Sequence, residues 1–121
     1  MITSYKDLEV YKDSYQLHLL VHRVSQKYPD YERYETGAQI RRASMSIPLN
    51  IAEGYGKKSS EIDFKRFLKM ALGSCNEIQV LLEMSKDLNY ITESEYKELS
   101  EKYDVLGKRI NVLIQKWKSN L

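Results

Sequence analysis

The chain has 121 residues, 42% hydrophobic and 30% charged, a composition that fits one folded domain over residues 1–121 and excludes a disordered chain or an integral membrane protein. Nineteen basic and seventeen acidic side chains give a net charge of +2, so the total charge does not indicate a nucleic-acid-binding protein. The N-terminus lacks the pattern of a signal peptide, and the single cysteine, Cys75, excludes an internal disulfide. We therefore expect a cytoplasmic protein.

Only five glycines and two prolines interrupt the sequence, and apolar residues recur at spacings of three and four, which predicts helices and no strands. The first predicted helix covers residues 6–27 and ends before Pro29. The second begins somewhere between residues 30 and 37, where Asp30 and Thr36 are both plausible N-caps, and ends near residue 54. Pro48 lies inside this helix, so we expect a kink there.

The third and fourth helices have clearer starts. Ser60 with Asp63, and Thr92 with Glu95, have the spacing of capping boxes, and the third helix should end near residues 89–90. The fourth helix continues with a regular heptad of apolar and aromatic residues, which are Tyr96, Leu99, Tyr103, Leu106, Ile110, Leu113 and Trp117. Of these we expect Leu99, Tyr103, Leu106, Ile110 and Leu113 to be buried.

Short loops between four long helices force neighbouring helices to run antiparallel, which predicts an all-α, up-down-up-down four-helix bundle. The alternative is a helical hairpin that completes its core by dimerising. The second and third helices each carry two apolar stripes, and a second apolar face must be buried against something, often another subunit.

Few residues have the arrangement of a catalytic or metal site. His18 and His22 have the i, i+4 spacing of two metal ligands, but no third histidine exists, so a structural role is the better interpretation. Cys75 lies in mid-helix, without the base or helix start that activates a thiol. Glu53 lies near a helix C-terminus, which disfavours a carboxylate, and we expect it to pair with Arg41 or Arg42 of its own or a neighbouring subunit. We predict no enzyme activity, no cofactor and no bound metal.

Basic residues cluster around the second loop. An antiparallel hairpin brings five of them to one end of the bundle, namely Lys57, Lys58, Lys65, Arg66 and Lys69. On a monomer they form an ordinary solvated face, but a ring repeats the patch and makes phosphate binding plausible. Tyr55, beside the loop, is then a candidate for stacking on an unpaired base. For the adjacent Arg41 and Arg42, structural pairing and RNA contact remain equal alternatives.

Three segments resemble a known bacterial family. They are residues 39–54 (QIRRASMSIPLNIAEG), residues 5–11 (YKDLEVY), and residues 63–68 (DFKRFL) followed by residues 71–74 (ALGS) and Glu77. The family is that of the four helix bundle proteins, also called ribosomal-RNA intervening-sequence proteins. Residues 39–54 are quite specific to this family, and the other two segments are moderately specific to it. Together the three segments span most of the chain.

The resemblance implies a left-handed four-helix bundle that assembles into a homo-oligomeric ring, typically a pentamer. It also implies similarity to the accessory variability proteins of diversity-generating retroelements, which bind nucleic acid and a reverse transcriptase. The family has no established biochemical activity, so RNA binding follows only by analogy. Two other functions stay open: a ring-shaped scaffold that binds another protein, and a metal protein or enzyme using His18 and His22.

Overall fold

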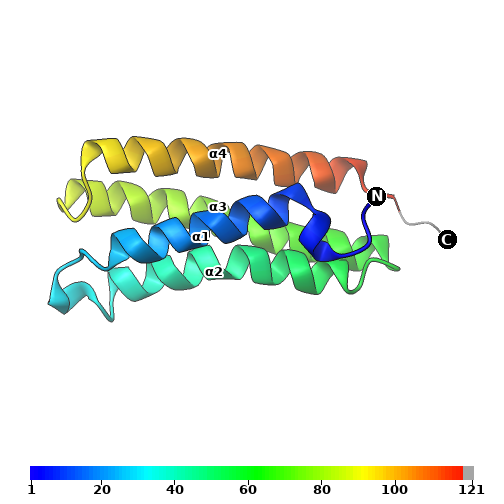
Figure 1. The fold of residues 1–121 in the computed structure, drawn as a ribbon, viewed down its shortest axis with the longest axis horizontal. Helices are drawn as coiled ribbons and strands as arrows, with labels where there is room; N and C mark the ends of the chain where they lie inside the picture. The colour runs from blue at the N-terminus through cyan, green and yellow to red at the C-terminus, as the bar shows by residue number, and fades with distance from the viewer. Residues whose placement is uncertain (119–121) are drawn as a thin grey trace.

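The computed structural model describes residues 1–118 and is all-α over that range. Four long helices follow one another in the order α1 (Glu9–Ser25), α2 (Thr36–Tyr55), α3 (Glu61–Asp87) and α4 (Glu93–Lys116). Two short 3-10 turns, Tyr5–Asp7 and Asp30–Glu32, precede α1 and α2. The helices lie side by side along one long axis, each turning back on the one before it, so the N-terminus and the end of α4 lie at the same end of the bundle (Figure 1). The predicted up-down-up-down four-helix bundle is confirmed.

Local hydrogen bonds explain where the helices begin. The Thr92 hydroxyl accepts from the Glu95 amide at 3.0 Å while the Glu95 carboxylate accepts from the Thr92 amide at 2.9 Å, which completes the predicted capping box. At α3 only half of the predicted box forms. The Ser60 hydroxyl accepts from the Asp63 amide, whereas the Ser60 amide donates to the Lys57 carbonyl at 3.0 Å instead of to Asp63.

The first helix begins later than the sequence suggested, whereas the second begins within the expected range. Ser4 caps a separate 3-10 turn, and Leu8 then has an extended backbone, so α1 starts at Glu9 and not at Lys6. The start of α2 is at Thr36, but neither predicted cap is used, because the N-cap position is occupied by Glu35 without a side-chain hydrogen bond. The helix then continues through Pro48 to Tyr55.

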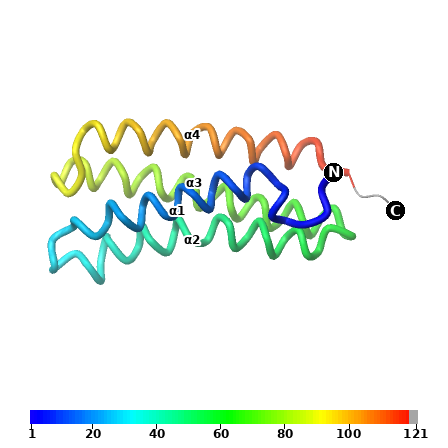
Figure 2. The backbone as a smooth tube through the Cα atoms, in the orientation of Figure 1, coloured from blue at the N-terminus to red at the C-terminus, as the bar shows by residue number. Residues whose placement is uncertain are grey.

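One continuous apolar core runs between the four helices. Leu99, Tyr103, Leu106 and Ile110 of α4 are buried, as predicted. Leu113, predicted to be buried with them, is only partly covered, because it lies in the last turn of α4, where the core ends. The smooth trace in Figure 2 shows that each helix is paired lengthwise with its neighbours in the sequence, whereas the packing of α1 against α4 is sparser than that of these sequential pairs.

Glycine permits the close approach of α2 to α3. A Cβ atom on Gly54 would lie 2.6 Å from the Cβ of Phe67 and 3.1 Å from the Phe64 ring. Because a Cβ atom is fixed to its backbone, Gly54→Ala can be accommodated only if the two helices separate. We expect it to lower the free energy of unfolding by about 1–3 kcal/mol, measured by urea denaturation at constant protein concentration.

Gly73→Ala is the matched control for this prediction. A Cβ atom there meets nothing within 4 Å, and alanine has the higher helix propensity, so this change should raise the free energy of unfolding by up to about 1 kcal/mol. Loss of stability of equal size in both variants would contradict the assignment of the close contact to Gly54.

Candidate nucleic-acid interface

Five predicted cations do gather at the end of the bundle formed by the α2–α3 loop and the start of α3, called the basic end below: Lys57, Lys58, Lys65, Arg66 and Lys69. The Phe67 ring links two of them. The Lys57 ammonium lies 5.8 Å from the ring centroid and the Arg66 guanidinium 4.7 Å, both within cation–π range. The α2–α3 loop and the first turns of α3 therefore place positive charges around one aromatic ring.

Nearby carboxylates neutralise part of this charge. Lys65 pairs with Glu61 at 3.4 Å and Arg66 with Asp63 at 3.8 Å, each within one turn of α3. Lys57 and Lys69 are exposed and form no ion pair with any residue in the range 1–118. Exposed pairs within one helical turn are weak, so they reduce the potential of the basic end without abolishing it.

The end of α4 adds charge that the sequence did not assign to this cluster. Trp117 packs edge-on against Phe64, with ring centroids 4.7 Å apart, and against Tyr55 at 6.4 Å. The exposed Lys118, next to Trp117, therefore lies at this end, whereas Lys116 lines a hollow against α1 together with Asp7 and Glu9. The sequence did contain an indication of the contact with Phe64. Trp117 continues the apolar heptad of α4, and a tryptophan at such a position is expected to pack against other side chains at the end of the bundle.

Tyr55 is not a stacking platform, and that prediction is wrong. Its side chain is 7% exposed and packs against Phe64, because position 55 lies on the core-facing side of the last turn of α2. Its hydroxyl instead accepts a hydrogen bond from Lys58 at 2.8 Å, and the Lys58 ammonium lies 4.0 Å from the ring centroid. Tyr55 therefore fixes the position of one cation of the basic end.

Arg41 and Arg42 lie at the other end of the molecule. Arg41 precedes Lys57 by sixteen positions, which correspond to about 24 Å at 1.5 Å per residue. Arg42 is exposed, whereas Arg41 is half-buried and donates to the Ser25 hydroxyl at 3.1 Å and the Arg33 carbonyl at 2.8 Å. The two arginines therefore do not extend the basic end.

The predicted pairing of Glu53 within its own chain is wrong. Glu53 lies about 16–18 Å along α2 from Arg41 and Arg42, too far for contact. It is exposed and forms no ion pair with the described residues. Water therefore solvates this carboxylate in the single chain, and the pairing with a neighbouring subunit stays a prediction.

One of the two histidines, His18, forms a hydrogen bond between α1 and α2. The Nδ1 atom of His18 lies 2.8 Å from the Ser44 hydroxyl, and the His18 and His22 rings are 6.2 Å apart in an edge-on arrangement. Burial and the nearby His22 lower the pKa of His18, which favours the neutral ring. Across residues 1–118, no three metal-ligating side chains come together.

Cys75 is buried in the middle of α3, and burial raises the pKa of its thiol to about 12. At neutral pH the thiol is therefore protonated, whereas a nucleophilic or metal-binding cysteine needs the thiolate. Its environment is that of a small apolar core residue.

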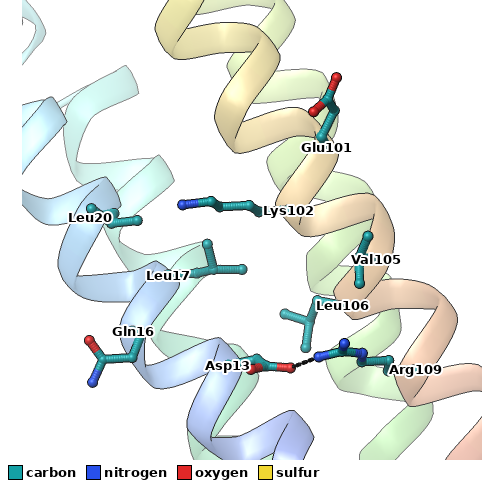
Figure 3. A pocket seen from close by; sticks show the side chains of 9 residues that line it. All are labelled: Asp13, Gln16, Leu17, Leu20, Glu101, Lys102, Val105, Leu106 and Arg109. Atoms are coloured by element: carbon teal, nitrogen blue, oxygen red, sulfur yellow. Dashed lines mark hydrogen bonds and ion pairs between the residues drawn. The ribbon is translucent and has the colours of Figure 1, made fainter.

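An open apolar groove runs between α1 and α4, where the two helices pack sparsely. One part is a hollow of about 440 Å³ whose floor includes Leu17, Leu20 and Leu106, and an ion pair between Asp13 and Arg109 crosses it at 2.5 Å (Figure 3). A second hollow of about 810 Å³ shares Val105 and Arg109 with the first and continues toward the N-terminus. Together they form one long apolar surface open to solvent.

A second apolar surface lies on α2 and α3. It consists of side chains that are 44–60% exposed: Met45, Leu49, Met70, Val80, Met84 and Leu88. Met45 and Leu49 belong to the second stripe that the sequence indicated on the second helix. The residues expected to widen the stripe of the third helix, Leu68, Cys75 and Leu82, are instead buried in the core, so the exposed Met70, Val80 and Met84 of α3 are ones that the sequence did not single out. Large apolar side chains exposed in this number on two neighbouring helices are typical of a protein–protein contact.

The fold and surfaces define a class: a four-helix bundle with a basic end and two uncovered apolar faces. No described helix has a stretch long and apolar enough to cross a lipid bilayer. The sequence profile of the 23S rRNA-intervening sequence proteins matches residues 6–112, and the chain belongs to this family. No curated protein sequence matches the chain.

Among solved structures, the fold is similar to that of a protein of unknown function of the S23 ribosomal protein family from Bacteroides thetaiotaomicron, at a TM-score of 0.78. The match covers 88% of this chain and 99% of the other, with 24% sequence identity. At that identity the similarity supports the four-helix fold and assigns no function.

Proposed function

We propose that this protein is a non-enzymatic RNA-binding accessory factor that acts as a homo-oligomeric ring, with a pentamer as the expected assembly. The observation that carries the proposal is the gathering of Lys57, Lys58, Lys65, Arg66 and Lys69 at one end of the bundle, joined there by Lys118. Membership of the 23S rRNA-intervening sequence protein family also supports the proposal, because the name of the family links its members to sequences that interrupt a ribosomal RNA.

The two uncovered apolar surfaces support assembly. A ring needs two different contact surfaces on each subunit, and the chain has both the α1–α4 groove and the exposed apolar stripes of α2 and α3. In a ring the basic ends of the subunits repeat around one axis. Several phosphates can then be contacted together, although a single end carries only a small net charge.

A scaffold that binds another protein is the second candidate function, and the α1–α4 groove favours it. Its rim carries Glu9 and Asp13 on the α1 side and charges of both signs on the α4 side. There Glu101 lies beside Lys102, which pairs with Glu98. An amphipathic helix with complementary flanks is a suitable occupant. A reverse transcriptase is one such partner by analogy with the related retroelement proteins.

Light scattering tests the assembly first, with a mass near five times 14.3 kDa as the expected result. Filter binding with a structured RNA should then show affinity that falls steeply as salt rises, because each neutralised phosphate releases counterions. Lys57→Glu combined with Lys58→Glu should weaken binding and reduce the slope of log affinity against log salt by about 0.7 for each single-strand phosphate that the variant no longer neutralises.

Arg23→Glu combined with Lys97→Glu makes the same change of charge at the opposite end of the bundle, on exposed side chains without ion pairs to residues 1–118, and should affect binding less. Equal weakening by both double variants would show that net charge alone controls binding. A ring that does not bind RNA at low salt would favour the scaffold.

A further inference from the structure

A small pocket lies at the end of the bundle opposite the basic end, under the loop that joins α1 to α2. It has a volume of about 260 Å³, and its walls are His22, Ser25, Gln26, Tyr28, Arg33, Tyr34 and Arg41. Pockets that hold drug-sized ligands have volumes of about 300–1,000 Å³, so this one is suited to a smaller group. None of its lining residues is a carboxylate, whereas two are arginines.

Arg41 is the central cation of the pocket. It is half-buried, its two hydrogen bonds go to the neutral Ser25 hydroxyl and the Arg33 carbonyl, and it forms no ion pair within residues 1–118. A guanidinium has five N–H donors, so donors remain for a ligand. A charge taken partly out of water without a counter-ion is costly, and an anion bound beside it removes that cost.

The surrounding structure holds this guanidinium in place. The Ser25 hydroxyl donates to the His22 carbonyl at 2.8 Å, so it is oriented to accept from Arg41. A Cβ atom on Gly37 would lie 3.2 Å from the Arg41 Nη1 atom, so the glycine leaves room for the side chain against the start of α2. Arg41 is therefore fixed before any ligand binds, which reduces the entropic cost of binding.

A second cation and an aromatic ring complete the pocket. Arg33 is exposed and lines the same space, which places two positive charges around it. Tyr34 also lines the pocket and is 82% exposed, so its ring is open to a base. The acidic residues of the loop, Glu32 among them, do not line the pocket, although the charge of Glu32 helps to raise the pKa of Tyr28, one of its walls.

We propose that the pocket formed by Arg33, Arg41 and Tyr34 binds the terminal phosphate monoester of a single-stranded RNA. Two guanidinium groups complement both the double negative charge and the oxygen atoms of a terminal phosphate monoester. An internal phosphodiester carries only one negative charge, so it complements the two arginines less well. The terminal base stacks on Tyr34. The identity of the ligand rests on the proposed RNA-binding function, whereas the anion site rests on the pocket itself.

Competition against a fluorescein-labelled single-stranded RNA tests the proposal with three unlabelled forms of one short sequence, carrying a 5′-phosphate, a 3′-phosphate or neither. One phosphorylated form should compete about tenfold better than the unphosphorylated RNA, the gain expected from one charge-assisted hydrogen-bonded contact. Arg41→Gln and Arg33→Gln should abolish this preference and leave binding of the unphosphorylated RNA nearly unchanged.

Arg23→Gln is the control, because it removes the same charge from an exposed side chain at the same end, outside the pocket. Its preference for the phosphorylated RNA should equal that of the unmodified protein. Tyr34→Ala should weaken binding of the phosphorylated RNA about tenfold, because the terminal base then has no ring to stack on. Equal competition by all three RNAs, or an equal loss of preference in Arg23→Gln, overturns the proposal.

A second measurement separates this proposal from the proposed function. Calorimetric titration with adenosine 5′-monophosphate should show binding that adenosine lacks and that Arg41→Gln abolishes. If RNA binds without preference for a terminal phosphate and the monophosphate does not bind, the pocket proposal is wrong and the RNA-binding function stands. If no RNA binds but the monophosphate does, the pocket binds a free nucleotide and the RNA-binding function is wrong.

Discussion

Replacing Phe64 by alanine should lower the free energy of unfolding by about 3–5 kcal/mol, the largest effect that we expect from a single substitution. Phe64 is fully buried and packs against both Trp117 and Tyr55. Its removal leaves a cavity between α2, α3 and the end of α4, and the fixed backbones around it can collapse only in part. Chemical denaturation monitored by circular dichroism measures the loss.

Ile62→Ala is the matched control for Phe64→Ala. The Ile62 side chain is 80% exposed in the same first turn of α3, so its removal should change stability by no more than about 0.5 kcal/mol. Because Trp117 rests on Phe64, the Phe64 variant should also loosen the end of α4, visible as a red shift of the fluorescence of the chain's single tryptophan. A stable Phe64→Ala variant with unchanged fluorescence would contradict the packing described for this end.

The second large effect is expected at Leu106, whose replacement by alanine should lower the free energy of unfolding by about 2–5 kcal/mol. Leu106 is 1% exposed and lies at the floor of the α1–α4 groove. The cost depends on how far α1 and α4 can close over the vacated space. Urea denaturation, with protein concentration held constant, measures the change without a contribution from assembly.

Two neighbours of Leu106 provide controls of different kinds. Val105→Ala removes a side chain that is 46% exposed and should cost far less than Leu106→Ala. Tyr103→Phe removes a hydroxyl that is buried without a hydrogen-bond partner among the described residues, so stability should stay the same or rise by about 1 kcal/mol. If Val105→Ala were as damaging as Leu106→Ala, the groove would not be open in solution.

The candidate site was predictable in part. The antiparallel arrangement of α2 and α3 follows from the short loop between them, and it brings Lys57 and Arg66 together around Phe67 as the sequence suggested. Tyr55 was misjudged because it is next to a loop, whereas its position on the last turn of α2 points it into the core. Lys118 was missed because its place at this end depends on the packing of Trp117 against Phe64, about fifty residues earlier in the chain.

The four helices, their order and their ends to within about three residues follow from the sequence alone. They depend on interactions within about four residues: apolar spacing, the Thr92–Glu95 capping box and the breaks at Pro29 and near residue 54. Only the tertiary structure decided that α1 and α4 leave a groove, and that Arg41 lies in a pocket without a carboxylate. Those features depend on how helices rotate and separate relative to one another, which is set by packing between residues far apart in the chain and not by local periodicity.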